Sequence, residues 1–503
     1  MKKRWIIILI LIWLGLHLAN PVDLIRNDLG RHIKNGELIL QGHWDVLYKN
    51  YYSYVNPEYP FVNEHWLFGV FCYVLWHYFA FTGLAFVYLI LELIAFYVFF
   101  RCWQRYSSFT LACAVGLLSI PLIASRSDIR PEGITYLFCG LFWWMIDCFQ
   151  QKRLKSQHLI IGLCLLQVIW VNMHFFFWMG PILTALFWWQ ARSNGENQQA
   201  DVLQKLFLIL LGMCLINPSG INGLLPPFRP DRSFFEYPNL ENYPVLDLLK
   251  DKTLAWRSVL VYFLASFSML IVPLFFLIRR EGLKKHILVG SLTLLLSIAA
   301  LKANRMIGLF GYFWIPLSMY VWGRWLQYAK TPQSRKNIEI SLLIMGIIVS
   351  ASVNFNWKQS HSLGIVPGSN NAAEFFKREK IGGPIFNDIN IGSYLIFHLS
   401  PERKIFIDTR PEAYPFILLK KASIQWDDKS WHELDQRYHF NVIFMTPEHT
   451  DWGRRFLIRS FEDPAWAPVY LSNEAIIFLK RNAQNAQIIK RNEIREDKIT
   501  ITL

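Results

Sequence analysis

The chain has 503 residues, of which 53% are hydrophobic and 16% aromatic. One soluble domain of this length does not carry so much apolar surface, so the composition excludes a soluble globular protein and indicates an integral membrane protein. The formal net charge of +14 does not indicate nucleic-acid binding, because the basic residues form short clusters between apolar runs rather than a continuous stripe.

The N-terminus resembles a signal peptide, but we expect it to remain as a first membrane helix. Basic residues at 2–4 precede an apolar run that ends at about residue 20. No cleavage site with small residues follows, and Asn20-Pro21 argues against one.

A long polar, charged and aromatic loop follows at 23–64. Asp28 falls where the first membrane helix would emerge into water, and an ionisable side chain at such a place is a candidate for function. The alternative is that Asp23 and Asp28 merely end a helix and stay solvated. The loop by itself leaves both interpretations open.

Eleven apolar runs are long enough to cross, or nearly cross, a bilayer. They lie at about 5–20, 83–100, 107–124, 133–149, 158–173, 176–190, 205–217, 257–278, 286–301, 307–323 and 338–354. A twelfth run, 65–81, is rich in Trp, Tyr, His and Phe, which is typical of the membrane interface. We therefore predict about eleven transmembrane helices and one interfacial helix in a domain that covers 1–356.

The distribution of charge predicts the orientation. If 65–81 does not cross, the loops on the side of the N-terminus contain 18 Lys and Arg against 3 Asp and Glu, and the opposite loops contain 12 against 13. Because cytoplasmic loops carry the excess of basic residues, we predict a cytoplasmic N-terminus and an outer face that carries the mixed loops. Counting 65–81 as a crossing would scramble this bias.

Several of these outer loops carry ionisable residues close to apolar runs. Such groups are costly at membrane depth and tend to face a cavity, so together they predict a polar site at the outer face. The members of this predicted site are Asp28, Arg126, Asp128, Arg130, Glu132, His174 and Arg305.

The alternative is that these charges neutralise one another. Arg126 would then pair with Asp128, Arg130 would pair with Glu132, and Arg305 would extend its charge to the interface. For any one of these residues, this alternative is the more common situation.

From about residue 357 the chain changes character. Short β-branched and aromatic runs at 384–387, 394–397, 404–408, 442–445 and 475–479 predict strands, and helical patterns occur at about 370–380, 411–424 and 428–439. We predict a soluble α/β domain over 357–480, which an odd number of spans places outside the membrane, and a flexible tail over 481–503. The seven cysteines all lie in or beside apolar segments without metal-ligand spacing, so no metal site is predicted.

Short motifs occur in a recognisable order along the chain. They are Asn27-Asp-Leu-Gly-Arg-His32, Gly42-His-Trp44, Asn63-Glu-His-Trp66, Arg130-Pro-Glu132, Trp170-Val-Asn-Met-His174, Asn217-Pro-Ser-Gly220, Ala303-Asn-Arg305, Phe386-Asn-Asp388, Gly392-Ser-Tyr-Leu395, and Phe406-Ile-Asp-Thr-Arg410 with Tyr414. With these motifs the chain resembles, from about residue 5 to 480, the GT-C superfamily of polytopic membrane glycosyltransferases that use polyprenyl-phosphate sugar donors.

The resemblance implies an inverting glycosyltransferase of the hexosyltransferase type at the outer face of the bacterial inner (cytoplasmic) membrane. A sugar would pass from a polyprenyl-phosphate donor to an acceptor that the sequence does not identify. Asp28 would be the catalytic base, and Glu132 would either orient Arg130 or be the base itself. Arg130 and Arg305 would bind the departing phosphate.

The same resemblance implies a set of substrate-binding residues: Arg31, Glu64, His65, Arg126, Asp128, Arg130, His174 and Arg305. In the outer domain it singles out Asp388, Asp408, Arg410 and Tyr414, although a structural Asp408–Arg410 pair is the more common arrangement. No cofactor is predicted. The divalent metal of some relatives cannot be carried over, because Asp128-Ile-Arg130 lacks an Asp-x-Asp pattern.

Two other functional classes stay open. A transporter or flippase of lipid-linked sugars would use the same arginines without a base, and a non-catalytic scaffold would use the outer domain to recruit partners. No internal repeat of broken helices favours transport, and the single acidic first loop favours transfer.

Overall fold

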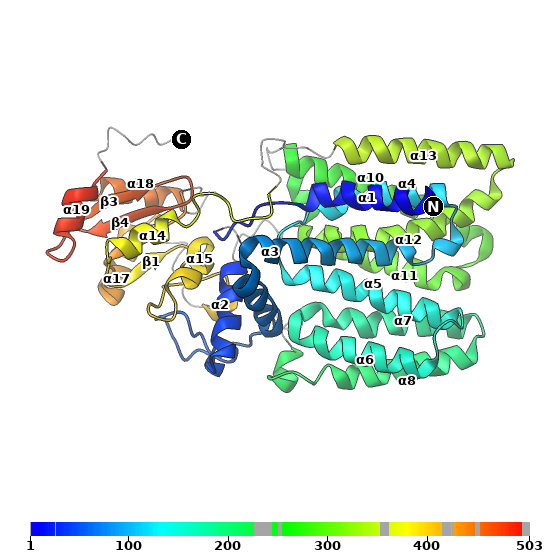
Figure 1. The fold of residues 1–503 in the computed structure, drawn as a ribbon, viewed down its shortest axis with the longest axis horizontal. Coiled ribbons are helices and arrows are strands. Elements are labelled where there is room, and N and C mark those ends of the chain that lie inside the picture. The colour runs from blue at the N-terminus through cyan, green and yellow to red at the C-terminus, as the bar shows by residue number, and fades with distance from the viewer. Residues whose placement is uncertain are drawn as a thin grey trace. The chain divides into compact units, whose positions relative to one another are not determined.

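A computed structural model describes residues 2–25, 27–225, 244–249, 254–352, 362–414, 424, 426–447 and 453–494. Contacts between residues divide them into two compact units (Figure 1). The helical unit contains residues 2–21 and 83–224 together with the described residues of 244–363. The α/β unit contains residues 22–82 together with the described residues of 364–494.

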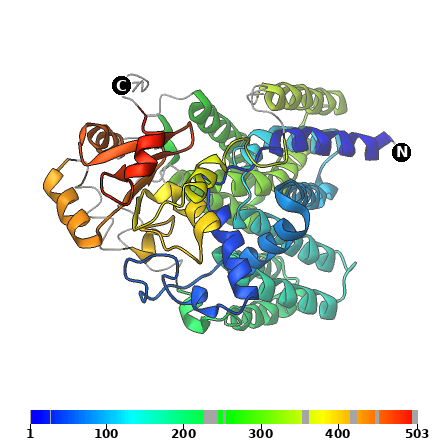
Figure 2. The same cartoon turned by 60° about the vertical axis from the view of Figure 1, so that its left-hand side comes forward.

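Each of the eleven predicted spans coincides with a helix of the helical unit, and these helices run side by side in both views (Figures 1 and 2). They are α1 (Lys2–Leu18), the second part of α3 (Trp66–Arg101), α4 (Phe109–Ala124), α5 (Pro131–Gln150), α6 (Ser156–Met173), α7 (Met179–Ser193), α8 (Asn197–Met213), α10 (Leu254–Glu281), α11 (Ile287–Lys302), α12 (Ile307–Trp325) and α13 (Pro332–Ser352). Five helical segments of the described residues are long and apolar enough to cross a membrane. The chain is therefore a multi-pass membrane protein.

Small residues allow the helices of this unit to pack closely around α4. A Cβ atom at Gly311 of α12 would lie 2.7 Å from the Cβ of Leu122, and one at Gly346 of α13 would lie 3.0 Å from the carbonyl oxygen of Ala114. Close approach through glycine is the usual way in which membrane helices gain packing contacts.

Helix α3 is broken at Ala80, whose backbone has φ 53° and ψ −168°. The break separates an aromatic first part from an apolar second part. The first part belongs to the α/β unit and the second to the helical unit, since the division falls between Thr82 and Gly83. The sequence prediction that 65–81 is distinct from the span at 83–100 is thus confirmed, and its interfacial position stays a prediction.

The α/β unit contains a four-stranded mixed sheet in the order β1-β2-β4-β3. Its strands are β1 (Ile385–Asn387), β2 (Val442–Met445), β3 (Trp466–Leu471) and β4 (Ile476–Lys480). β1 pairs in parallel with β2, with Phe386 opposite Ile443, and the two other pairs are antiparallel. Among its described residues after 364, this unit also contains the helices α14 (Asn371–Arg378), α15 (Ile389–Leu399), α17 (Asp428–Tyr438), α18 (Arg454–Glu462) and α19 (Ala486–Asn492). Aromatic side chains such as Phe386, Trp431 and Phe478 form its core.

Two of the predicted strands are wrong. The run 394–397 lies inside α15, because the side chain of Asp388 accepts hydrogen bonds from the amides of Asn390 and Ile391 and so starts a helix. The run 404–408 forms only an isolated bridge between Ile405 and Ser53. Strand β3 was not predicted. Of the expected helix at 411–424, a 3-10 turn at Pro411–Ala413 is described, and residues 415–423 lie outside the described residues.

The expected flexible tail also needs correction for its described part. Helix α19 follows Asn485, a buried residue whose side-chain amide donates to the side-chain oxygen of Asn441 at 2.9 Å. The amide of Ile494 donates to the carbonyl oxygen of Pro468. Residues 481–494 are therefore packed against the sheet, and 495–503 lie outside the described residues.

The long first loop is a folded part of the α/β unit. It contains α2 (Leu29–Leu40) and a 3-10 turn at Trp44–Leu47. Two glycines allow α2 to pack closely against its neighbours. A Cβ at Gly30 would lie 2.7 Å from the carbonyl oxygen of Ser393 on α15, and a Cβ at Gly36 would lie 2.2 Å from the carbonyl oxygen of Gly69 on α3. The segment 23–64, which we expected within the membrane domain, therefore packs with the α/β elements.

Candidate functional site

The structure divides the predicted site residues between the two units. Arg126, Asp128, Arg130, Glu132, His174 and Arg305 lie in the helical unit. Asp28, Arg31, Glu64, His65, Asp388, Asp408, Arg410 and Tyr414 lie in the α/β unit.

The first set lies at helix ends. The turn between α4 and α5 carries Arg126 and Arg130, and Pro131 occupies the first position of α5, where a missing amide hydrogen has no cost. Glu132 follows in the first turn of α5. It is 8% exposed, and it accepts a hydrogen bond from Nη2 of Arg126 at 3.2 Å. We call the group of charged residues around this carboxylate the Glu132 cluster.

The ion pairs of this cluster differ from those expected under the alternative that its charges only neutralise one another. Arg126 pairs with Glu132 rather than with Asp128, and Nε of Arg130 lies 3.7 Å from Oδ2 of Asp128. Arg130 has an extended backbone with φ −141° and ψ 160°, whereas Glu132 is helical. Arg130 is thus the last residue before α5, and Glu132 lies in its first turn.

His174 and Arg305 join the cluster from two other helix junctions. His174 ends α6, is buried, and its Nδ1 lies 2.7 Å from Oγ1 of Thr135 on α5. Nε1 of Trp170 donates to the same Oγ1 at 3.0 Å, which fixes Thr135 between the two helices. The guanidinium of Arg305 lies 5.5 Å from the ring centroid of Phe175, next to His174 in the chain.

The carboxylate of Glu132 lies within electrostatic range of Arg126, Arg130, His174 and Arg305. The structure therefore brings together the residues of the α4–α5, α6–α7 and α11–α12 junctions, as the sequence predicted. Their role in function stays a prediction.

Four polar residues of this region were not among the site residues predicted from the sequence. Tyr88 and Glu92 lie on α3, Tyr136 on α5 and Tyr312 on α12. The hydroxyl of Tyr312 lies 3.4 Å from Oε2 of Glu92, a buried residue. One signal was present, because Glu92 is the single charged residue of the apolar run 83–100. A carboxyl group in such a run commonly faces other polar groups.

In the α/β unit, Asp28 stands directly before α2. Helix α1 ends at Leu18, so Asp28 does not end the first membrane helix. The amide of Leu29 donates to the side chain of Asn27, and the Asp28 carboxylate makes no capping bond to α2. Instead, its Oδ2 lies 3.6 Å from Nη2 of Arg31, and the Asp28 side chain is 31% exposed. The expected position of Asp28 at the end of the first membrane helix is therefore wrong, and its role stays a prediction.

Arg31 connects this aspartate to the rest of the unit. Its amide donates to Oγ of Ser393 on α15 at 3.0 Å, and its side chain is buried. Its guanidinium acts electrostatically on Asp408 and Glu412. Asp28 and Arg31 thus lie beside the Asp408 network.

The Asp408 network is closely hydrogen bonded. The Asp408 carboxylate accepts from Nε and Nη2 of Arg410 at 2.7 and 2.6 Å and from the hydroxyl of Tyr414 at 2.6 Å. Oδ1 of Asn50 in the first loop accepts from Nη2 of Arg410 at 3.1 Å. Burial would raise the pKa of Asp408, but the charge and hydrogen bonds of Arg410, with Arg31 and Tyr414, lower it below its ordinary value. These bonds fasten the first loop to residues 408–414.

Three other predicted residues have distinct surroundings. Burial, assisted by the charge of Glu412, raises the pKa of Glu64 to about 8. The ring of His65 lies 5.7 Å from that of His32 in an edge arrangement. Asp388 caps α15 and accepts from the amide of Thr446 at 2.8 Å, which is a structural arrangement. Among the described residues, no group of three or more His, Cys, Asp or Glu is placed to hold a metal ion.

No protein-family model matches the sequence, and no curated protein sequence is significantly similar to it. Several solved structures are similar in fold. An oligosaccharyltransferase AglB from Archaeoglobus fulgidus, in complex with an inhibitory peptide and a dolichol-phosphate, aligns with a TM-score of 0.57 and 10% identity over 96% of this chain and 74% of AglB. AglB tethered to an acceptor peptide that contains an NVT sequon aligns with a TM-score of 0.58 and 10% identity over the same shares.

ArnT from Cupriavidus metallidurans, in the apo state, aligns with a TM-score of 0.53 and 11% identity over 94% of this chain and 96% of ArnT. At these identities the similarity concerns the fold, which extends over nearly the whole chain. The chain therefore shares its fold with AglB and ArnT, which agrees with the GT-C-like fold that the sequence predicted.

Proposed function

We propose that the protein is a membrane glycosyltransferase that takes a sugar from a polyprenyl-phosphate donor at the outer face of the cytoplasmic membrane. The GT-C fold supports this class of function, and one of the similar AglB structures contains a dolichol-phosphate. The observation that carries the proposal is the Glu132 cluster, in which three arginines from two helix junctions, α4–α5 and α11–α12, act electrostatically on one carboxylate.

Arginine suits the phosphate end of such a donor. A guanidinium stays charged at all relevant pH values and can bind two phosphate oxygens at once. Arg130 and Arg305 are the proposed phosphate ligands, as the resemblance implies, and both act electrostatically on the carboxylate of Glu132. His174 is buried next to them and would position the sugar.

The transfer step requires one base and one stabilised leaving group. A hydroxyl oxygen of the acceptor attacks the anomeric carbon from the face opposite the phosphate, and the bond between that carbon and the phosphate oxygen breaks. The electron pair of the broken bond remains on the phosphate, where the arginines stabilise it. The acceptor proton passes to a carboxylate, and the configuration at the anomeric carbon is inverted.

Asp28 is the better candidate for this base. A carboxylate that is already hydrogen bonded to a guanidinium is a poor proton acceptor, which disfavours Glu132. The Asp28 carboxylate makes no capping hydrogen bond to α2, is partly exposed, and its ion pair with Arg31 in the described structure is longer, at 3.6 Å. Arg31 would hold the carboxylate in position, while Glu64 and His65 would contact the sugar or the acceptor.

The test is sugar transfer by the purified protein in lipid nanodiscs, from a panel of polyprenyl-phosphate sugars. Wild type is compared with Asp28→Asn, Glu132→Gln and the control Asp45→Asn, which changes an exposed aspartate of the same loop. We expect donor turnover by wild type and by the control, and at least a hundredfold loss in Asp28→Asn with donor binding retained, since a positioned base contributes roughly 10²–10⁴-fold.

Other outcomes would change the assignment. Full turnover by Asp28→Asn with loss in Glu132→Gln would make Glu132 the base. Donor binding without turnover in wild type and in all variants would contradict a transferase. Movement of the donor across the membrane of vesicles of the same lipid composition would then indicate transport.

A further inference from the structure

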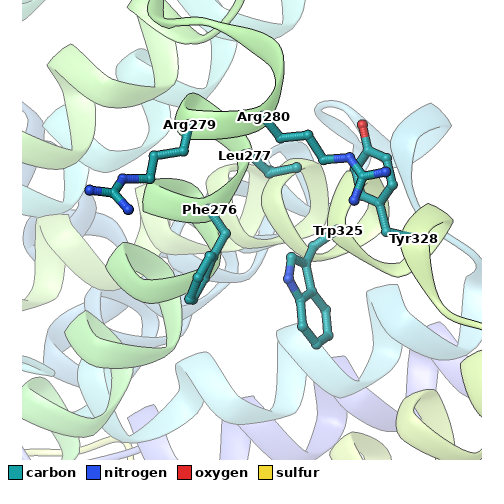
Figure 3. A pocket seen from close by; sticks show the side chains of 6 residues that line it. All are labelled: Phe276, Leu277, Arg279, Arg280, Trp325 and Tyr328. Carbon is teal, nitrogen blue, oxygen red and sulfur yellow. The ribbon is translucent and has the colours of Figure 1, made fainter.

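A cavity of about 330 Å³ lies in the helical unit, at the end of α10 and of the turn that follows α12 (Figure 3). No predicted site residue lines it. Its lining consists of three apolar and three polar or charged side chains: Phe276, Leu277, Trp325, Arg279, Arg280 and Tyr328.

The cavity has both apolar and charged lining. Leu277 is buried, and the rings of Phe276 and Trp325 point the same way in Figure 3. Arg279 lies on the side of Phe276, and Arg280 lies on the side of Trp325 and Tyr328 (Figure 3). The two guanidinium groups extend in opposite directions, that of Arg279 over Phe275 and that of Arg280 over Tyr328 (Figure 3).

One of these arginines is held by an aromatic ring. The guanidinium of Arg280 lies 3.8 Å from the ring centroid of Tyr328. The hydroxyl of Tyr328 donates to Oε1 of Glu281 at 2.9 Å, which fixes the ring. Arg280 is thus positioned before any ligand arrives.

The nearest carboxylate does not neutralise the two arginines. Glu281 is bound by Arg324, and its Oε2 lies 3.7 Å from Nε2 of His286. Within the described part of the chain, neither Arg279 nor Arg280 lies within 4 Å of a carboxylate; each lies over an aromatic ring. Their charges are available to an anion.

The cavity lies where two apolar helices end. The candidate spans Ser258–Glu281 and Asn304–Tyr328 both terminate at it, and the loop that follows the first span carries Lys284 and Lys285. Tryptophan, tyrosine and arginine at the ends of membrane helices occupy the level of the lipid headgroups. The sequence predicts that these ends are cytoplasmic, where the leaflet is rich in anionic lipid.

We propose that this cavity binds the phosphate headgroup of an anionic membrane phospholipid. The guanidinium of Arg280 would contact the phosphate oxygens, and that of Arg279 would reach them by turning away from Phe275. The first part of an acyl chain would lie between Phe276 and Trp325. The apolar walls distinguish a phospholipid from a free phosphate, which has no part that would gain from them. The proposal is independent of the transferase activity.

The test measures phospholipid binding to the detergent-purified full chain by native mass spectrometry and by thermal shift. The probes are phosphatidylglycerol, phosphatidylcholine and soluble glycerol phosphate. The variant Arg279→Gln with Arg280→Gln is compared with Lys284→Gln with Lys285→Gln, which removes the same charge from the neighbouring loop without touching the cavity.

We expect phosphatidylglycerol to bind wild type and the lysine variant with the same affinity. It should bind the arginine variant about 25-fold more weakly, because each arginine near the membrane surface contributes roughly fivefold. Trp325→Ala, which keeps both arginine charges, should weaken the binding of phosphatidylglycerol but not that of glycerol phosphate.

Three results would overturn the proposal. An equal loss of phosphatidylglycerol affinity in the arginine and lysine variants would indicate a diffuse basic surface. Glycerol phosphate that binds as tightly as the lipid would indicate a free phosphate site, and an equal affinity for phosphatidylcholine would show that the site does not select anionic lipid.

Discussion

The hydroxyl of Tyr88 bonds to the main chain of Arg130 on both sides of that residue. It donates to the carbonyl oxygen of Arg130 at 2.7 Å and accepts from the amide of Arg130 at 3.2 Å. Gly133 allows this approach, because a Cβ there would lie 2.3 Å from the same hydroxyl. A side chain of α3 therefore determines where α5 begins and where a proposed phosphate ligand stands.

We predict that Tyr88→Phe raises the KM for the donor about tenfold, which corresponds to about 1.4 kcal/mol and is the size of one or two lost hydrogen bonds. The ring remains in place, so the protein should still fold. The control is Tyr97→Phe on the same helix, whose hydroxyl contacts only the exposed Arg101 in the described structure. Steady-state kinetics with both variants measures the effect. An unchanged KM in Tyr88→Phe would show that the position of Arg130 does not depend on this contact.

The Asp408 network gives a prediction about stability. Asp408→Asn leaves the buried guanidinium of Arg410 without its charge partner, and breaking one side of such a pair costs about 3–5 kcal/mol. Thermal unfolding in detergent should therefore show a clear loss. As a control, Asp428→Asn removes an exposed partner of Arg459 and should cost less than about 1 kcal/mol. Similar losses in the two variants would contradict a structural role for the network.

The sequence predicted the helices of the membrane part well, because every lipid-spanning helix must be a long apolar run. It also placed β1, β2 and β4, each a β-branched or aromatic run next to turn signals. It failed at 394–397, where the composition favours a strand although Asp388 was a local signal for the start of a helix. The hydroxyl of Tyr394 also accepts from the amide of Ala373. A long-range contact of this second kind leaves no local trace in the sequence.

The candidate site was predicted in part for the same reason. Charged residues at helix junctions are visible in the sequence, so the members of the Glu132 cluster could be named. The sequence did not indicate their pairing, which is Arg126 with Glu132 and Arg130 with Asp128. Tyr88 and Tyr312 were missed because a tyrosine in an apolar helix looks like a packing residue, and only the fold shows that they surround Glu92.

The crossing of α2 with the first part of α3 gives a third prediction. A Cβ at Gly36 would lie 2.2 Å from the backbone oxygen of Gly69, and backbone cannot give way as a flexible side chain can. Gly36→Ala should therefore destabilise the α/β unit by about 1–3 kcal/mol. Gly212→Ala on α8 meets nothing within 4 Å and should be neutral or slightly stabilising, because alanine favours a helix. Thermal unfolding of both variants decides; a stable Gly36→Ala would mean that the two helices can separate without cost.

Glu64 gives the last prediction, which concerns pH. Its pKa in the folded protein is about 8, compared with an ordinary value of 4.5, because burial and Glu412 disfavour the charged form. Between these pH values the folded state holds a proton on Glu64 that the unfolded state releases. The contribution of Glu64 to the free energy of unfolding should therefore be greatest below pH 4.5 and should fall as the pH rises to about 8. Glu64→Gln cannot ionise and should remove this part of the fall, whereas Glu58→Gln, an exposed glutamate of the same loop, should keep the wild-type slope. Melting temperatures from pH 5 to pH 9 measure the slopes, and a wild-type slope in Glu64→Gln would show that this carboxyl group is charged in the folded protein.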